Sequence, residues 1–395
     1  MNSFSGELDH RLDALREQEL FRELRRVDSA QGSHIEIDGK TLLNFSSNDY
    51  LGLANHPVLK EASIRAIEKY GAGAGASRLI CGSLAPFHEL EMALAAYKKT
   101  DAALTFSSGF AAALGAITAL AGKDDIIILD KLVHACIVDA TRLSGAKLRV
   151  FAHNDLNDLE DKLKWAKKVC AEKSEVRILI VTESIFSMDG DVAPLREIVV
   201  LKNKYDAWLM VDEAHATGIV GQGGRGLADE FGVSKHIEIQ MGTLGKALGA
   251  AGGYICGSRS LIDFLVNRAR SLIFSTAPVT ASAAAAQAGI ELASSSEGET
   301  RRKTLWQSIE QLHRALQPGQ PKYSSAIIPL ILGDEAKTMA AATRLREQNI
   351  FVPGIRYPSV ARGSARLRIT LTAGHTVNDL SALIRALEPF VNRIS

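Results

Sequence analysis

The sequence predicts an α/β protein with a mostly parallel central sheet and a smaller α+β domain at the C-terminal end. Two observations support this fold class. From about residue 46, short apolar runs alternate with stretches of helical periodicity, which is typical of a parallel sheet buried on both faces. From about residue 286, strands and helices are fewer and do not form a second full winding. With 395 residues, the chain is long enough for more than one domain.

The expected strands of the central sheet are ALTF (103–106), IIIL (126–129), RILIVTE (177–183), AWLMVDE (207–213), IEIQM (237–241) and GYIC (253–256). Helical patterns cover 87–98, 110–121, 155–171 and 194–204, with an alanine-rich helix near 281–288. The C-terminal part has helical patterns at 299–316 and 335–348, strands at IIPLIL and RLRITL, and a closing helix from about Thr376.

The N-terminal part has a different pattern. Leucines at helical spacing predict a helix from about Gly6 to Val27. Two short alternating runs follow, and the Asp38-Gly39 pair between them predicts a hairpin. We therefore expect an N-terminal helix and hairpin in residues 1–45, a large domain in 46–285 and a small domain in 286–395.

Composition excludes several classes of function. The net charge of +1 gives no strong field for nucleic acid or an anionic membrane, and 46% apolar residues is an ordinary globular balance. The four cysteines are scattered, which indicates free thiols in a reducing compartment. The charged N-terminus does not have the apolar core of a signal peptide, and no apolar run is long enough to span a bilayer. We expect a cytoplasmic protein, and the histidine spacing predicts no metal site.

Polar residues follow three of the expected strands, where ligands bind in such sheets. Lys246 lies between glycines after one strand, where burial can lower its pKa for Schiff-base chemistry. Asp212 ends a neighbouring strand and can keep a pyridinium nitrogen protonated. A helix that begins at Ser108-Gly109 offers backbone N–H groups to a phosphate. Together these features predict a pyridoxal phosphate site.

Two other motifs give weaker interpretations. Residues 212–215 match the DEAH box of nucleic-acid helicases. A helicase also needs a phosphate-binding loop upstream of this box, but the nearest candidate, GTLGKA, lies downstream. Residues 221–226 match G-x-G-x-x-G, but they do not follow the first strand of a βαβ unit, so we expect a flexible loop there.

Six segments make the chain recognisable: 43–57 (LNFSSNDYLGLANHP), 106–112 (FSSGFAA), 181–195 (VTESIFSMDGDVAPL), 211–226 (VDEAHATGIVGQGGRG), 242–253 (GTLGKALGAAGG) and 365–376 (ARLRITLTAGHT). With these segments the chain resembles the α-oxoamine synthases, a branch of the fold-type I (aspartate aminotransferase-like) pyridoxal phosphate enzymes. The resemblance runs from about Leu20 to the C-terminal helix. Ala113 and Cys136 depart from the commonest pattern, which places asparagine and serine there.

The resemblance implies roles for individual residues. The cofactor would be bound by Lys246, Asp212 at the pyridine nitrogen, His215 at the ring hydroxyl, His134 on the ring face, Gly109, Phe110 and Thr243 on the phosphate side, and Ser187 nearby. The substrates would be bound by Arg368 at the amino-acid carboxylate, Asn48, His134, and Arg25 and Ser359 toward the acyl group. Of these, Lys246, His134, Asp212 and His215 are the expected catalytic residues. Ser275 and Thr276 would reach the phosphate site of a neighbouring subunit, which implies a homodimer.

The family joins an amino acid to an acyl thioester. Segments 46–57 and 366–376 favour the branch that condenses L-alanine with pimeloyl-CoA, or pimeloyl carrier protein, in biotin biosynthesis. Glycine C-acetyltransferase is the alternative within the family. A non-catalytic partner subunit of a heteromeric relative is the alternative from another class, but such subunits do not have the lysine that is present here as Lys246.

Overall fold

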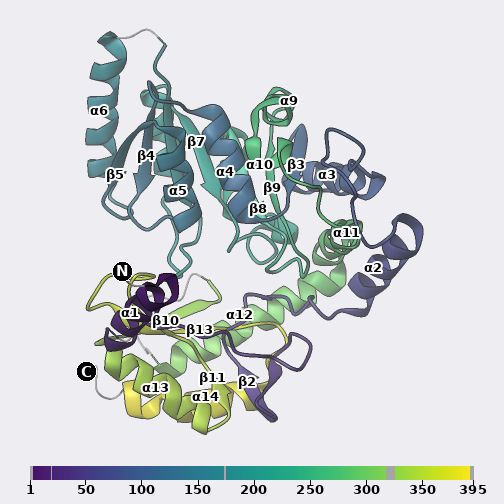
Figure 1. The fold of residues 1–395 in the computed structure, drawn as a ribbon, viewed down its shortest axis with the longest axis vertical. Helices are drawn as coiled ribbons and strands as arrows, with labels where there is room; N and C mark the ends of the chain where they lie inside the picture. Colours follow the sequence, from purple (N-terminus) through teal and green to yellow (C-terminus); the bar gives the residue numbers. More distant parts are fainter. Residues whose placement is uncertain (1–2, 19, 173–174, 317–324, 392–395) are drawn as a thin grey trace.

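The computed structural model describes residues 3–18, 20–172, 175–316 and 325–391. Figure 1 shows two parts, an upper one built around a large sheet and a lower one that contains two small sheets and both ends of the chain. The long helix α12 (Ser296–Leu316) runs from the upper part into the lower one. The predicted division at residues 45 and 285 stays a prediction.

The large sheet has seven strands in the order β3-β9-β8-β7-β6-β4-β5. All neighbours pair in parallel except β9, which runs antiparallel to both β3 and β8. The strands are β3 (Ala102–Phe106), β4 (Ile126–Asp130), β5 (Lys147–Phe151), β6 (Ile178–Glu183), β7 (Trp208–Asp212), β8 (Ile239–Thr243) and β9 (Gly253–Gly257). This confirms the predicted mostly parallel central sheet.

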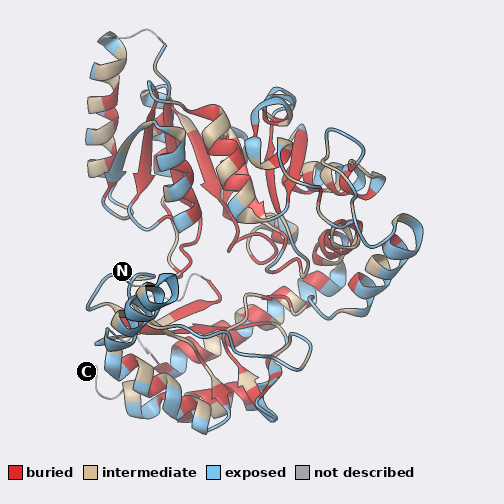
Figure 2. Ribbon diagram, viewed as in Figure 1, coloured by how far each residue is buried: buried red, intermediate tan, exposed pale blue. Residues whose placement is uncertain are grey.

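The helices beside this sheet are α2 (Pro57–Tyr70), α3 (Ala85–Lys98), α4 (Gly109–Leu120), α5 (Ala135–Ser144), α6 (Leu156–Glu172), α7 (Leu195–Lys204), α8 (Leu227–Glu230), α9 (Arg259–Arg268), α10 (Arg270–Ile273) and α11 (Thr280–Ser294). Helices α3, α4, α6 and α7 have bounds close to those predicted, and α11 is longer than the helix predicted near 281–288. Helices α2, α5, α8, α9 and α10 were not predicted. Because helices cover both faces, every residue of β3, β4 and β6 is buried, and Figure 2 shows these strands in red.

Two three-stranded sheets lie in the lower part. One joins β10 (Ile327–Gly333), β13 (Ala365–Thr370) and β12 (Gly354–Ile355). The other adds β11 (Ile350–Phe351) to the predicted hairpin of β1 (His34–Ile37) and β2 (Lys40–Asn44). The helices here are α13 (Glu335–Glu347) and α14 (Val377–Val391). The hairpin turn uses Asp38 and Gly39, both at positive φ, as its sequence predicts.

The N-terminal helix is shorter than predicted. Helix α1 (Phe4–Glu17) ends well before Val27, although the leucine spacing continues. Beyond the helix, Phe21 has one local and one long-range contact: Arg16 lies over its ring, and its carbonyl accepts a hydrogen bond from Arg356. Leu24 is fully exposed, so it does not belong to a buried helix face as the leucine spacing predicted.

The parallel strands β4, β6, β7 and β8 all point their carboxyl ends to one edge of the large sheet, as the pairing register requires. That edge faces the lower part of the molecule in Figure 1. The residues that follow these strands therefore lie between the two parts. Within the described ranges, no helix has both the length and the apolar character needed to cross a bilayer.

Candidate active site

Lys246 lies three residues beyond the end of β8, in a turn that continues into β9. Its Nζ lies 2.7 Å from Nε2 of His215. Burial lowers the pKa of Lys246 to about 8, although the carboxylates of Asp212 and Glu183 act in the opposite direction. About a tenth of this amine is therefore neutral at pH 7, far more than for an ordinary lysine.

Two acidic residues end neighbouring strands beside this lysine. Asp212 of β7 and Glu183 of β6 are partners in the strand register, and both are buried. Burial raises the pKa of Asp212 and raises the pKa of Glu183 well above its usual value, and the negative charge of Asp212 adds to the effect on Glu183. Lys246 opposes both shifts. Both carboxyl groups are therefore weaker acids than usual, and Lys246 is the neighbouring cation that favours their charged forms.

Glu183 is a site residue that the sequence reasoning missed. Its Oε1 is buried and has no hydrogen-bond partner among the described residues. The signal was present, because Glu183 ends the strand 177–183 in the same way that Asp212 ends the strand 207–213. A buried carboxyl oxygen without a partner costs free energy, so it indicates a group that is completed by a bound molecule.

His215 connects Lys246 to a tyrosine that the sequence reasoning also missed. The hydroxyl of Tyr50 lies 2.5 Å from Nδ1 of His215. Burial holds the pKa of His215 well below its ordinary value and raises the pKa of Tyr50 to about 12. Both side chains are thus neutral at neutral pH, so His215 can exchange a hydrogen bond with Lys246 without adding a second positive charge.

Arg368 of β13 reaches this site from the lower part of the molecule. Its guanidinium donates to the carbonyl of Ser187 at 2.7 Å and to Oδ1 of Asn48 at 3.2 Å. The side chain is buried, and none of the acidic side chains described in the structure forms an ion pair with it. A buried guanidinium held only by neutral acceptors is suited to bind a carboxylate. The structure thus brings together three predicted residues, Arg368, Asn48 and Ser187.

His134 caps the start of α5 and is close enough to Asp212 and Lys246 for their charges to act on its pKa. Its Nδ1 accepts a hydrogen bond from the backbone N–H of Cys136 at 3.2 Å and lies 2.9 Å from the Cys136 thiol. Burial lowers the pKa of His134 and raises the pKa of the thiol to about 12, so the ring is neutral and the thiol is protonated. With Nδ1 as the acceptor, Nε2 carries the proton.

The predicted phosphate site is at the N-terminus of α4. The side chain of Ser108 caps the helix by accepting from the backbone N–H of Ala111. Gly109 lies against Thr243 at the end of β8, where an added Cβ would be 3.9 Å from the Thr243 hydroxyl oxygen. Phe110, in the same turn, is about half exposed. The first helical N–H groups have no acceptor within the helix, so this turn is suited to bind an anion.

Four predicted residues lie outside this cluster. Arg25 and Ser359 lie near the N-terminal segment, where Arg25 is 6.0 Å from the ring of Phe351 and Ser359 accepts from Arg22. Ser275 and Thr276 lie between α10 and α11, and Thr276 pairs with Ser77. Within the described ranges, neither Ser275 nor Thr276 forms a hydrogen bond with Lys246, Asp212 or His215. Their predicted contact with a second subunit stays a prediction.

The helicase-like and dinucleotide-like strings have a structural explanation. Glu213, the second residue of the DEAH string, forms a buried ion pair with Lys98 and accepts from the backbone N–H of Ala228. Gly226 has φ of 117°, and an added Cβ would lie 2.5 Å from the Glu213 carboxylate. The glycines of 221–226 thus allow the chain to pack tightly on Glu213, and the string forms a turn with a fixed packing partner.

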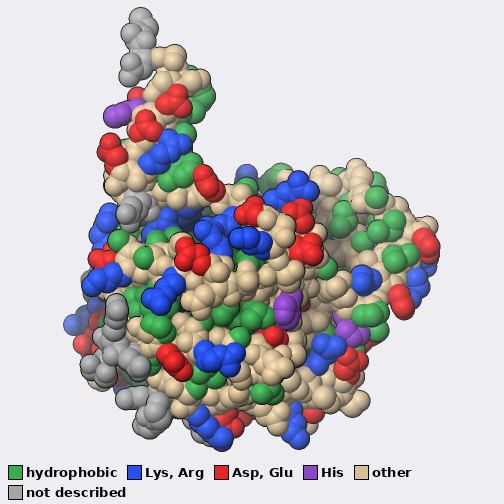
Figure 3. Space-filling model, turned by 90° about the horizontal axis from the view of Figure 1, so that it is seen from below, with side chains coloured by type: hydrophobic (Ala, Val, Ile, Leu, Met, Phe, Trp, Pro, Cys, Tyr) green, Lys and Arg blue, Asp and Glu red, His purple; other side chains and the backbone are tan. Residues whose placement is uncertain are grey.

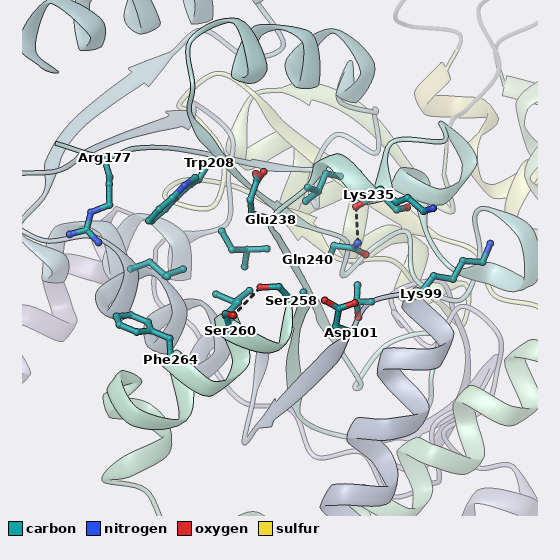
Figure 4. Close-up of a pocket in the computed structure, with 17 residues that line it drawn as sticks. Lys99, Asp101, Arg177, Trp208, Lys235, Glu238, Gln240, Ser258, Ser260 and Phe264 are labelled. Atoms are coloured by element: carbon teal, nitrogen blue, oxygen red, sulfur yellow. Dashed lines mark hydrogen bonds between the residues drawn. The ribbon is translucent and has the colours of Figure 1, made fainter. Parts of the chain in front are cut away.

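A large hollow lies elsewhere on the sheet. Figure 4 shows a pocket of about 720 Å³ at the amino ends of β7 and β8, lined by residues that include Trp208, Lys235 and Glu238. Two of the charged groups there have ion-pair partners: Glu238 pairs with Lys202 at 2.5 Å, and Arg177 pairs with Asp125 at 3.3 Å. This pocket contains none of the residues around Lys246.

The residues at the carboxyl ends of the strands fit pyridoxal phosphate. Lys246 supplies a neutral amine, Asp212 a buried acid for the ring nitrogen, and the first turn of α4 with Thr243 a phosphate site. The unpartnered Glu183 oxygen is a further sign that a polar molecule completes the site.

This fold and site define the class of protein. The chain belongs to the aminotransferase class I and II family, whose model matches residues 40–387. A structure of SPT solved with PLP covers 98% of this chain and 97% of its own, with a TM-score of 0.90 and 28% identity. The predicted fold class, cofactor and resemblance are thus confirmed, and the chain is a pyridoxal phosphate enzyme.

Two similar proteins indicate which member of this family the chain resembles. A Geobacter sulfurreducens protein named 8-amino-7-oxononanoate synthase is 45% identical over 388 residues, which are 98% of this chain and 97% of the relative. One from Thermoanaerobacter pseudethanolicus with the same name is 44% identical over 96% of this chain and 95% of its own length.

Proposed function

We propose that the chain catalyses the decarboxylative condensation of L-alanine with pimeloyl-CoA, or pimeloyl carrier protein, to 8-amino-7-oxononanoate, the thiol and CO2, in biotin biosynthesis. The 45% identity to a relative of that name over almost the whole chain carries this conclusion. The arrangement of Lys246, Asp212 and Arg368 supports it, because it provides a base, an acid for the cofactor ring and a carboxylate site in one place.

Arg368 and Asn48 are placed to bind the amino acid. The two guanidinium nitrogens of Arg368 that contact Asn48 can bind the carboxylate of alanine, with Asn48 turning its amide toward the same group. Fixing the carboxylate orients the α-carbon toward Lys246, which is the positioning that a reaction of two substrates needs.

Lys246 is placed to remove the α-proton. Its pKa of about 8 leaves a neutral fraction that accepts a proton at Nζ, and His215 holds that nitrogen at 2.7 Å. When bound, pyridoxal phosphate withdraws electrons from the α-carbon and so makes its proton acidic. The α-carbon then bonds to the thioester carbonyl carbon as the C–S bond breaks, and the leaving thiolate takes a proton from solvent. The alanine carboxylate departs as CO2, and Nζ of Lys246 can return its proton to the carbon that the carboxylate leaves.

The remaining roles are part of the same proposal. His134 would donate from Nε2 above the cofactor ring, and Gly109, Phe110 and Thr243 would hold the phosphate. Ser275 and Thr276 would contribute from a second copy of the chain in a homodimer. The free cysteines, two of them buried, support a cytoplasmic location.

The experiment is to measure thiol release by the cofactor-loaded protein from L-alanine plus pimeloyl-CoA, beside glycine plus acetyl-CoA. Turnover with the first pair alone supports the proposal. Turnover with the second pair alone would keep the roles of Lys246 and Asp212 and make the chain a glycine C-acetyltransferase.

A further inference from the structure

His153 lies between two carboxylates at the carboxyl ends of the strands. It follows β5, and its Nδ1 lies 2.9 Å from Oδ1 of Asp130, the last residue of β4. Its Nε2 lies 2.7 Å from Oδ2 of Asp191, which belongs to the loop after β6. On the face of the molecule seen in Figure 3, acidic and basic side chains lie side by side at the surface, where single ion pairs contribute little. Asp130 is instead buried, so its charge needs a cation that stays in place.

The imidazole ring of His153 carries a positive charge at neutral pH. Partial burial acts to lower the pKa of His153, but the hydrogen bonds to Asp130 and Asp191 outweigh it and raise the pKa to about 10. Both ring nitrogens are therefore protonated, and each donates to one carboxylate. The ring also meets the ring of Phe186 edge to face, with 4.4 Å between the centroids. His153 thus contacts the loop after β6 near its beginning, at Phe186, and near its end, at Asp191.

These contacts hold the loop of residues 184–193 against the large sheet. Asn154, the next residue after the histidine, donates from Nδ2 to Oδ2 of Asp191 at 2.9 Å and to the carbonyl of Val192 at 3.1 Å. Across the loop, the backbone N–H of Phe186 donates to the carbonyl of Asp191 at 3.1 Å. Because the two sides of the loop are joined in this way, an anchor at Asp191 also fixes the tip between them.

The tip of this loop holds the arginine that is proposed to bind the amino acid. The carbonyl of Ser187 accepts from Nε of Arg368 at 2.7 Å, and the carbonyl of Gly190 accepts from the hydroxyl of Ser325 at 2.8 Å. Both donors belong to the lower part of the molecule. A shift of the loop would therefore move the acceptor that orients the guanidinium of Arg368. Binding of a carboxylate by two parallel N–H groups depends on that orientation.

We propose that His153 is a positioning residue for the amino-acid site: by holding Asp191 it fixes the loop 184–193, and the loop fixes Arg368. The inference rests on the proposed function, in which Arg368 binds the carboxylate of alanine. Within the described residues, no hydrogen bond joins His153 to Arg368, so the effect passes through the loop. A residue of this kind changes the binding of one substrate and leaves the chemistry at Lys246 unchanged.

The test compares His153→Gln with His34→Gln in the cofactor-loaded protein. Glutamine has no charge, and it offers one donor nitrogen to Asp130 and Asp191 in place of two. His34 also faces an acid, Asp379, at 3.7 Å, but it belongs to β1, outside the loop and its partners. We expect His153→Gln to raise KM for L-alanine about tenfold, with kcat and KM for pimeloyl-CoA nearly unchanged, because one charge-assisted hydrogen bond is lost. His34→Gln should match the wild type.

Asp191→Asn separates positioning from a general loss of structure. It keeps the shape of the side chain and an acceptor for His153, so it should raise KM for L-alanine less than His153→Gln does. The double variant should be no worse than His153→Gln, because the same pair is already broken. Additive losses in the double variant, or equal rises in KM for both substrates, would overturn the proposal. If His153→Gln does not fold, Asp191→Asn decides alone, and a wild-type KM for L-alanine in that variant would overturn the proposal.

Hydrogen exchange separates this proposal from the proposed function, because it needs no turnover. We expect the backbone amides of the 184–193 peptide to exchange about tenfold faster in His153→Gln than in the wild type or in His34→Gln. If the wild type releases no thiol from L-alanine and pimeloyl-CoA, the proposed function fails, but faster exchange would still support the positioning role. Exchange of this peptide at the wild-type rate in His153→Gln would overturn it.

Discussion

The two edges of the large sheet differ in how their charged side chains are paired. At the carboxyl ends of β6, β7 and β8, Glu183, Asp212 and Lys246 are close together, and burial shifts the pKa of each. At the amino ends, charged residues line a hollow of about 720 Å³, but Glu238 and Arg177 have ion-pair partners.

This difference shows that the size of a hollow does not locate the chemistry in this molecule. At the amino ends, ion pairs compensate the charges of Glu238 and Arg177. At the carboxyl edge, burial without full compensation makes an amine less basic and two acids weaker. The predictions below change residues of the site at the carboxyl ends of the strands. Their controls are residues of the same type at the amino ends or on the same strand.

The largest effect is expected from Lys246→Ala. Loss of the base and of the covalent attachment should lower turnover of L-alanine and pimeloyl-CoA by about 10³-fold or more. The measurement is steady-state thiol release with saturating cofactor. Lys235→Ala, at the amino edge, is the control and should retain wild-type turnover. Comparable losses in the two variants would remove the distinction between the edges.

Asp212→Asn should have the next largest effect. It keeps the shape of the side chain but removes the charge that holds the ring nitrogen protonated, so turnover should fall about 10²-fold, within the range of single acid–base groups. Circular dichroism should show an unchanged fold. Asp101→Asn at the amino edge should be silent, and wild-type activity in Asp212→Asn would exclude the assigned role.

Arg368→Lys should affect the amino acid selectively. Lysine keeps the charge but cannot present two parallel N–H donors, so KM for L-alanine should rise about tenfold while KM for pimeloyl-CoA stays constant. Arg366→Lys is the matched control, two residues away on β13, where Arg366 pairs with Asp189. An equal rise of both KM values in Arg368→Lys would indicate a structural role only.

The smallest effect concerns the pH at which cofactor capture by Lys246 is half-maximal. Only the neutral amine of Lys246 can capture the cofactor, so the capture rate of the apoprotein should rise about tenfold per pH unit below its pKa and level off above about 8. Asp212 raises the pKa of Lys246, so Asp212→Asn should move the midpoint to lower pH. Stopped-flow absorbance measures the rate, and a midpoint near 10.5 in the wild type would contradict the burial of the amine.

The sequence predicted the buried strands and the residues at their ends because apolar runs and strand-end polar groups are local patterns. It did not predict β5, because this edge strand is mostly exposed and lacks a continuous apolar run. It extended α1 to Val27 because the leucine spacing is local, whereas the hydrogen bond of Arg356 to the carbonyl of Phe21 joins residues far apart in the chain.

The site residues were also predicted where they belong to local sequence patterns and missed where they depend on long-range contacts. Lys246, Asp212 and His215 stand in recognisable motifs, and the structure brings them together. Tyr50 was not identified because its partner His215 lies 165 residues further along the chain. Glu183 was not identified because its place beside Asp212 depends on the register of two strands.

The most direct test of the site at the carboxyl edge is borohydride reduction of the cofactor-loaded protein, followed by peptide mapping by mass spectrometry. Reduction fixes the cofactor to the nitrogen that holds it. We predict that the cofactor mass appears on the peptide that contains Lys246 and on no other. Attachment at another lysine, such as Lys235 at the amino edge, would contradict the account.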